Sequence, residues 1–232
     1  MGLKKEEIII GIGDLKNSET FLKCKSVEII LFPEKCVLLS QDNILIVADL
    51  HLGKAHHFNR NGIMVPTGTD ETTLKRLESL LQILRPQKLV FLGDLFHSEL
   101  NSSWQLFHHW LDKASQFTGQ IMLVKGNHDI LDESVFANLG IPVVIEMRIG
   151  RFLLTHEPAH NDLFNIYGHL HPGIKIRGKG KQKLRLPCFG YGGSGLVLPA
   201  FGEFTGLHIL SPASYSKFFA IADGLIFEFG DN

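Results

Sequence analysis

Metal-ligand side chains occur in several clusters along this chain, and each cluster follows an apolar stretch of sequence. The clusters are Asp49-Leu50-His51, Gly93-Asp94, Gly126-Asn127-His128-Asp129, His156-Glu157 and Gly168-His169-Leu170-His171. Histidine and aspartate are common ligands of first-row metals, and Asn127 adds a neutral amide oxygen. Because no cysteine joins the set, mixed nitrogen and oxygen ligation favours manganese, iron or zinc over a structural zinc bound by thiolates.

These side chains are too numerous for one ion, so they predict a two-metal site. A carboxylate such as Asp94 can bridge two ions, and paired ions roughly 3.5–4 Å apart clamp the attacking and leaving oxygens of an in-line phosphoryl displacement. Two divalent ions, two aspartate ligands and a bridging hydroxide sum to a charge of about +1, which suits a phosphodiester anion. Such ions lower the pKa of bound water from ~15.7 toward roughly 7, so hydroxide is available to attack phosphorus at neutral pH.

Buried strands and helices must position these groups. Apolar stretches at 44–48, 88–94, 121–129 and 151–158 predict buried strands, the third of which ends in a polar loop, and helical spacing of leucines predicts a helix over 69–84. Thr69 or Asp70 could cap that helix, and a second helix is predicted over 103–116. Short strands with many glycines follow, so we expect an α/β sandwich built as one domain. Each cluster alone fits an ordinary turn. In such folds, however, side chains that follow the carboxyl ends of the strands lie close together, so we expect the clusters to form one site.

Composition sets the class of protein. The chain has 232 residues, of which 44% are apolar and 20% charged, and its net charge of −1 means that a polyanion must be met by a local patch. The sequence contains no run of 18 apolar residues, so no membrane span is predicted. The first residues lack a secretory signal, and Cys24, Cys36 and Cys188 are widely spaced, so we expect a reduced, cytoplasmic setting.

The order of the clusters resembles that of the calcineurin-like metallophosphoesterase superfamily over roughly residues 44–172. The resemblance implies a four-layer α/β/β/α sandwich with a binuclear metal site. It implies that one metal is held by Asp49, His51, Asp94 and His171, and the other by Asp94, Asn127, His156 and His169. His128 would face the phosphate as a general acid or transition-state donor, and Asp129 would support its loop.

Further stretches are similar to the bacterial ligase-associated metallophosphoesterases. They are ADLHLGK at 48–54, FNRNGIMVP at 58–66, GDLFHS at 93–98, LPCF at 186–189 and LPAFGEFTG at 198–206. This resemblance implies a manganese-dependent phosphodiesterase, specifically a DNA endonuclease associated with a DNA ligase and a helicase in DNA repair. Iron, zinc or magnesium are the alternative metals. The similarity covers most of the chain, so we expect one domain over 26–232 after an N-terminal extension, 1–25.

One position departs from the wider superfamily. In the phosphoprotein phosphatases, the residue three after the aspartate of the Gly-Asp motif is a second aspartate, which pairs with the catalytic histidine; here it is His97. A histidine is not a constitutive anion at neutral pH, so that pairing is not expected. We hypothesise that His97 contacts the substrate phosphate or the leaving oxygen, the alternative being a packing role.

Basic residues alternate with other residues between positions 175 and 185: Lys175, Arg177, Lys179, Lys181, Lys183 and Arg185. In a β-hairpin this alternation places all of them on one face, where they could neutralise the phosphates of a nucleic acid. The alternative is a solvated hairpin whose lysines protect a sheet edge. Arg60, which follows the first cluster, could bind substrate phosphate bidentately or form a surface salt bridge.

The sequence therefore predicts a hydrolase that cuts nucleic-acid phosphodiesters. A small-molecule phosphodiesterase or a nucleotide-sugar lipid pyrophosphatase is the first alternative, although no long insertion between the clusters is present to hold acyl chains. A non-catalytic scaffold of the same fold is the second alternative. It predicts damaged ligand positions, and every such position is intact in this chain.

Overall fold

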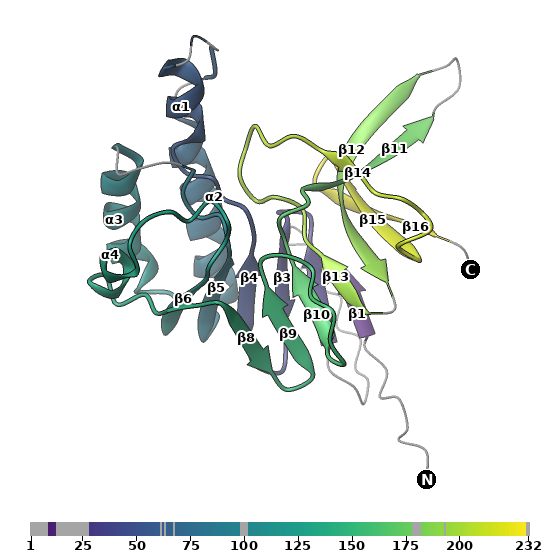
Figure 1. The fold of residues 1–232 in the computed structure, drawn as a ribbon, viewed down its shortest axis with the longest axis horizontal. Coiled ribbons are helices and arrows are strands. Elements are labelled where there is room, and N and C mark those ends of the chain that lie inside the picture. Colours follow the sequence, from purple (N-terminus) through teal and green to yellow (C-terminus); the bar gives the residue numbers. More distant parts are fainter. Residues whose placement is uncertain are drawn as a thin grey trace.

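The apolar runs of the sequence form two β-sheets packed face to face (Figure 1). The structure is a computed structural model that describes residues 9–12, 28–60, 62, 64–66, 68–97, 102–177, 182–192 and 194–230. For residues 9–12, 57, 60 and 102 it describes the backbone alone. Arg60, at the end of a helix, therefore has no described side chain, and Lys179 and Lys181 lie outside the described residues.

The first sheet is seven-stranded, in the order β1-β2-β3-β4-β5-β6-β7. Strands β4, β5, β6 and β7 are mutually parallel, and β4 is buried along its whole length because both faces of the sheet are covered. The strands are β1 (Ile9–Ile12), β2 (Glu28–Phe32), β3 (Cys36–Leu39), β4 (Ile44–Val47), β5 (Lys88–Leu92), β6 (Gln120–Val124) and β7 (Val143–Val144).

The second sheet is nine-stranded, in the order β14-β11-β12-β13-β10-β9-β8; in addition, β15 pairs with β12, and β16 pairs with β15. Strands β9 and β10 are parallel, whereas β11 and β12 form an antiparallel hairpin. The strands are β8 (Glu146–Ile149), β9 (Phe152–Thr155), β10 (Phe164–Tyr167), β11 (Pro172–Arg177), β12 (Lys183–Gly192), β13 (Gly195–Val197), β14 (His208–Ile209), β15 (Lys217–Ala222) and β16 (Leu225–Gly230).

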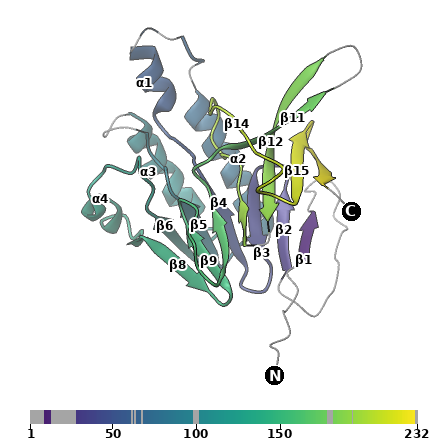
Figure 2. The same ribbon diagram turned by 45° about the vertical axis from the view of Figure 1, so that its right-hand side comes forward.

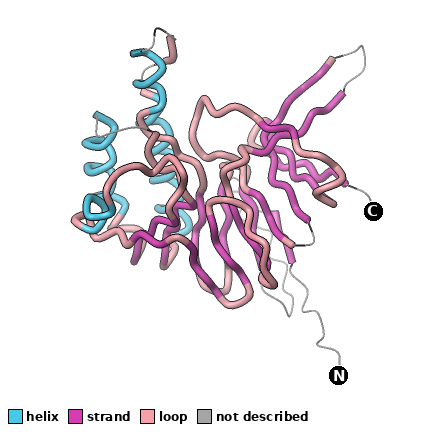
Figure 3. The backbone as a smooth tube through the Cα atoms, in the orientation of Figure 1, coloured by secondary structure: helices cyan, strands magenta, loops and turns pink. Residues whose placement is uncertain are grey.

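The helices of the described chain all precede β7 and gather on one side of the molecule, as Figure 3 shows. They are α1 (Lys54–Arg60), α2 (Thr69–Leu84), α3 (Ser102–Ala114) and α4 (Glu133–Ala137). Both longer helices were predicted, but the expected cap of α2 is wrong. The N-cap is Gly68, with φ 86° and no side-chain hydrogen bond. The carboxylate of Asp70 instead accepts hydrogen bonds from Gly53 N at 2.9 Å and Ser103 Oγ at 2.5 Å.

Three hydrophobic clusters hold these layers together. One joins α2 and α3 to the first sheet through residues such as Leu77, Phe91 and Phe107. The second fills the space between the two sheets, with Ile46, Val90 and others facing strands of the second sheet. The third lies on the outer face of the second sheet, where Leu210 and Tyr215 pack against the strands and no helix occurs among the described residues.

These layers confirm the predicted single-domain α/β sandwich of the metallophosphoesterase type. The boundary expected at residue 25 stays a prediction, although Ile9–Ile12 already pairs with β2 as a parallel strand. Within the described residues, none of the helices combines the length and the apolar character that crossing a bilayer requires.

Candidate metal centre

The predicted ligands lie where parallel strands of both sheets end. Asp49 and His51 follow β4, Asp94 follows β5 and Asn127 follows β6. His156 follows β9, and His169 and His171 follow β10. Beyond the strands, the chain after β4 continues alongside the chain after β5. Asp49 N donates to Gly93 O at 3.2 Å and His51 N to Asp94 O at 2.9 Å. The same edge of the sandwich, between α1 and the β11–β12 hairpin, is visible in Figures 1 and 2.

Asp49, His51 and His171 form the first group of ligand atoms, all within 4.8 Å of one another. The Nε2 atoms of His51 and His171 are 3.0 Å apart, and His171 Nε2 lies 3.5 Å from Asp49 Oδ1. Asp49 is fully buried and His51 is 3% exposed. Nitrogen and oxygen lone pairs therefore converge on one point, which is the arrangement that a cation stabilises.

Asp94, His156 and His169 form the second group, again within 4.8 Å. Asn127 Oδ1 completes it, at 3.0 Å from both His156 Nε2 and His169 Nδ1. The two imidazole nitrogens are themselves 3.1 Å apart. His156 also uses its second nitrogen, because Nδ1 lies 3.0 Å from Leu92 O, which orients the ring as second partners of ligating histidines do.

Asp94 lies between the two groups and faces both. Its Oδ1 is 3.3 Å from His156 Nε2, and its Oδ2 is 3.8 Å from His51 Nε2. A carboxylate with one oxygen toward each group is suited to bridge two cations. The structure thus brings all the side chains predicted as ligands together around two groups of ligand atoms, and the metal that each of them holds stays a prediction.

Tight backbone turns allow this convergence. Five of the ligands have left-handed backbone: Asp49 (φ 54°), His51 (φ 50°), Asp94 (φ 49°), His169 (φ 65°) and His171 (φ 46°). Gly168 is needed where the turn before His169 passes the first group, because a Cβ there would lie 2.6 Å from Asp49 Oδ2. A Cβ on Gly126 would collide with Asp94 N and Oδ1.

The sequence of this chain matches a known family over most of its length. The family model for calcineurin-like phosphoesterases matches residues 43–194. The chain belongs to the calcineurin-like phosphoesterase family. It is a metal-dependent phosphoesterase, and its two groups of ligand side chains fit a binuclear site.

Solved structures similar to this phosphoesterase include the Pseudomonas putida nuclease MPE. That protein is 32% identical, with a TM-score of 0.75, and the match covers 90% of this chain and 98% of the nuclease. A protein of unknown function from Aquifex aeolicus is 20% identical, with a TM-score of 0.40 over 60% of this chain and 82% of its own. A predicted phosphoesterase from Streptococcus pneumoniae is 16% identical, with a TM-score of 0.34 over 81% of this chain and 97% of its own. Among curated proteins, none matches significantly.

His128 and His97 lie beside the first ligand group of the phosphoesterase without joining it. The ring centroids of His97 and His128 are 5.4 Å apart, and those of His51 and His97 are 5.5 Å apart. His128 is exposed, and its backbone N donates to Asp94 Oδ1 at 2.9 Å, which ties its position to the carboxylate between the two ligand groups. Both histidines are therefore close enough to the ligands to meet a bound phosphate, and their contact with substrate stays a prediction.

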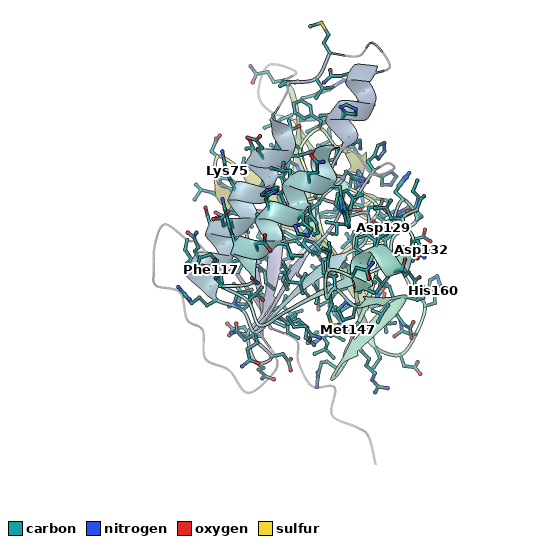
Figure 4. The ribbon with its side chains drawn as sticks, turned by 90° about the vertical axis from the view of Figure 1, so that its left-hand side faces the viewer. Lys75, Phe117, Asp129, Asp132, Met147 and His160 are labelled. Carbon is teal, nitrogen blue, oxygen red and sulfur yellow. The ribbon has the colours of Figure 1, made fainter. Side chains whose placement is uncertain are left out.

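Asp129 supports this loop from below. Its carboxylate accepts from Leu95 N at 2.9 Å and from Gly126 N at 2.8 Å, so it joins the turn after β6 to the turn after β5. Burial raises the pKa of Asp129, while the hydrogen bond from Gly126 N partly offsets that rise. Figure 4 shows Asp129 close to Asp132, the N-cap residue of α4. The predicted role of Asp129 as a loop support fits these contacts.

Lys54 is a cation near the centre that the sequence pattern did not single out. It is the first residue of α1, and its N donates to His51 O at 3.1 Å. Burial lowers the pKa of Lys54, and the charges of Asp94 and Asp49 oppose that shift, so the ammonium lies within electrostatic range of the two carboxylates. The only sequence signal is a lysine three residues after a ligand histidine. The positive charge of Lys54 would attract a phosphate and repel a metal cation.

Burial and mutual contacts shift the pKa values of three residues of the centre. Burial lowers the pKa of His51 to about 3, and the nearby Lys54 charge adds to this effect. Burial also opposes the charged form of His156, but the hydrogen bond and charge of Asp94 outweigh it and raise the pKa of His156 to about 9. Asp94 is the counterpart: burial favours its neutral form, yet the hydrogen bond with His156 prevails and lowers its pKa to about 2.

Uptake of a divalent cation at pH 7 is therefore expected to release about one proton from His156, because a ligating imidazole must be neutral. The apparent affinity for Mn²⁺ should rise about tenfold per pH unit between 7 and 9, up to the pKa of about 9. Calorimetric titration in two buffers of different ionisation enthalpy measures the proton count. His108→Ala, an exposed histidine of α3, is the control. A count of zero at pH 7 would contradict the expectation.

The segment 198–206 braces the first ligand group from outside. Phe201 N donates to Ala48 O at 2.8 Å and Gly202 N to Asp49 O at 3.1 Å. A Cβ on Gly202 would collide with Leu50 O, so the two chains touch at the backbone. Arg76 of α2 holds this segment through an ion pair of 2.7 Å with Glu203, a hydrogen bond to Phe201 O, and a guanidinium 4.3 Å from the centre of the Phe201 ring.

Proposed function

We propose that this phosphoesterase is a nuclease that hydrolyses phosphodiester bonds of DNA with two divalent cations, Mn²⁺ in first place. The observation that carries the proposal is the pair of ligand groups on either side of Asp94, together with the basic hairpin whose strand β11 begins directly after His171. The P. putida protein that is 32% identical over most of both chains is itself described as a nuclease. We further propose that the protein acts in the cytoplasm, in DNA repair alongside a ligase and a helicase.

The residues divide the chemistry between them. Asp49, His51, Asp94 and His171 would hold one cation, and Asp94, Asn127, His156 and His169 the other. The cations supply Lewis acidity and make hydroxide available at neutral pH. His128, fixed by its backbone bond to Asp94, would donate a proton or hydrogen bond to the phosphoryl or leaving oxygen. His97, beside His128, would bind a substrate oxygen, and Lys54 would add positive charge.

The β11–β12 hairpin is the proposed contact for the DNA backbone. The register pairs Lys175 with Arg185 and Arg177 with Lys183, so these four cations occupy one face. Cross-strand neighbours of like charge destabilise a hairpin, and a polyanion on this face would relieve that repulsion. Because β11 begins directly after His171, Lys175 lies about 13 Å along an extended strand from that ligand. Arg60 and Lys179, whose side chains are not described, stay predictions as substrate contacts.

A variant with both Lys175→Gln and Arg185→Gln is expected to bind single-stranded DNA with a weaker salt dependence. Each phosphate-binding cation that is removed reduces the slope of log affinity against log salt by about 0.7, and this variant removes two. Fluorescence anisotropy at several salt concentrations measures the slope. Lys75→Gln is the matched control, because Lys75 is exposed on α2 and lies away from Asp129 in Figure 4. An unchanged slope in the double variant would assign the hairpin to edge protection instead.

The function itself is tested by comparing substrates. Purified protein loaded with Mn²⁺, Mg²⁺ or Zn²⁺ is assayed on bis(4-nitrophenyl) phosphate and on single-stranded, stem-loop and duplex DNA, with RNA of the same sequences. The proposal expects cleavage of DNA with Mn²⁺ above the other metals. Cleavage of small esters alone would favour a small-molecule phosphodiesterase. Stoichiometric metal binding without any hydrolysis would favour the non-catalytic scaffold.

A further inference from the structure

An exposed aromatic ring lies in the loop that joins β13 to β14. Phe204 is 50% exposed and has a left-handed backbone, with φ 56°. This conformation is costly for a bulky side chain, and such strain persists mainly where the surrounding structure imposes it, often at functional sites. The ring also belongs to none of the hydrophobic clusters formed by the described residues. Its position therefore needs a reason other than core packing.

The loop is attached to the metal centre at both ends. Near its start, Gly202 N donates to Asp49 O at 3.1 Å, and at its end His208 N donates to His171 O at 3.0 Å. Asp49 and His171 both belong to the first ligand group. Phe204 is two residues from Gly202, so its Cα lies within about 7 Å of the Gly202 Cα. Figure 1 shows the loop in yellow-green, between the helices and the β11–β12 hairpin.

Neighbouring residues fix the loop and leave Phe204 outward. Phe201 is fully buried beneath the guanidinium of Arg76, and Glu203 is paired with the same arginine at 2.7 Å. The residues before Phe204 are thus anchored to α2. The residues after it lead into β14, which pairs with β11 through His208 and Pro172. The ring stands on a short, doubly anchored loop, not at the tip of a long one.

The same connections place the loop that carries Phe204 between two features that suit phosphate. On one side is the first ligand group, through Asp49. On the other is β11, which carries Lys175 on the basic face of the hairpin. Proteins that bind single-stranded nucleic acid combine cations along the backbone with aromatic rings on which bases stack. A base inside a duplex is already stacked on both faces, so only an unpaired base can use such a ring.

We propose that Phe204 is a stacking platform for an unpaired base next to the scissile phosphate. The proposal rests on the nuclease function proposed above and deepens it, because it explains how the protein would distinguish single-stranded from duplex DNA next to the metal centre. The stacked base would hold its own phosphate at the cations, and the ring would select against duplex DNA. Phe204 is then a residue that determines specificity and takes no part in proton transfer.

The test compares two substrates for each variant. A single-stranded DNA oligomer offers bases, and bis(4-nitrophenyl) phosphate serves as a phosphodiester without them. The ratio of kcat/KM for the oligomer to kcat/KM for the ester is expected to fall about tenfold in Phe204→Ala. Phe204→Leu keeps apolar bulk without an aromatic face and should fall similarly, whereas Phe204→Tyr should keep the wild-type ratio. Phe227→Ala, an exposed aromatic of β16, is the control.

An abasic scan adds a second readout. Removing a single base near the cleaved bond should slow the wild-type protein at one position and leave Phe204→Ala insensitive there. An unchanged ratio in Phe204→Ala, with wild-type cleavage of the oligomer intact, would overturn the stacking role and leave the nuclease function standing. Full selectivity in Phe204→Leu would also overturn it, in favour of simple apolar contact. A wild-type protein that cuts only the ester would overturn both proposals.

Discussion

Asp94→Asn is expected to reduce phosphodiester hydrolysis by more than about 100-fold and to weaken binding of both cations, because losing even an outer partner of a metal ligand typically costs about 10–100-fold. Asp94 is the side chain whose two oxygens face the two groups, at 3.3 Å from His156 Nε2 and 3.8 Å from His51 Nε2. Asparagine keeps the size and can still accept the hydrogen bond from His128 N. The substitution therefore removes the charge and leaves the fold.

Metal content and turnover are both measured for this variant. Inductively coupled plasma mass spectrometry after dialysis reports the cations retained, and hydrolysis of bis(4-nitrophenyl) phosphate reports turnover. Asp112→Asn, on the exposed side of α3, is the matched control. If Asp94→Asn retained two cations per chain and more than a tenth of the activity, the bridging role assigned to Asp94 would be refuted.

His128→Ala is expected to lower kcat by about 10²–10³-fold, the loss typical of removing one donor that stabilises developing charge. The reason is positional: the residue lies outside both ligand groups, with its ring 5.9 Å from that of His51. Cation binding should therefore stay close to that of the wild-type protein. This contrast separates His128 from the ligands, whose loss affects both quantities.

The measurement is kcat alongside calorimetric titration with Mn²⁺. A substrate with a good leaving group, such as an aryl ester, should be less affected than DNA if His128 protonates the leaving oxygen. His108→Ala serves as the matched control, since that histidine is exposed on α3. A His128→Ala protein that lost its cations would instead place His128 among the ligands.

Much of the candidate centre is predictable from the sequence because strand ends and ligand types coincide. The apolar runs before Asp49, Asp94 and Asn127 identify buried parallel strands, and parallel strands of one sheet end at a common edge. The sequence does not show which oxygen of Asp94 faces which group. That detail depends on the turn geometry of the folded chain, such as the φ of 49° at Asp94.

Other features depend on contacts between distant segments and have no local signal. Asp70 suits a helix cap by residue type, but its carboxylate bonds Gly53 and Ser103 instead, so Gly68 begins α2 uncapped. The bracing of Asp49 by Gly202 joins positions more than 150 residues apart. The electrostatic interaction of Lys54 with Asp94 and Asp49 likewise has no local signal, because it depends on where the folded chain places α1 relative to the strand ends.

The left-handed turns of the ligands have a consequence for how this protein can change. A non-glycine residue in that conformation costs roughly 1–2 kcal/mol, and the centre contains five such ligands. Selection in the laboratory for heat tolerance alone should therefore favour glycine at these positions, and each such substitution would raise the melting temperature while removing a candidate ligand. At these few residues, thermal stability and catalytic activity therefore favour different amino acids.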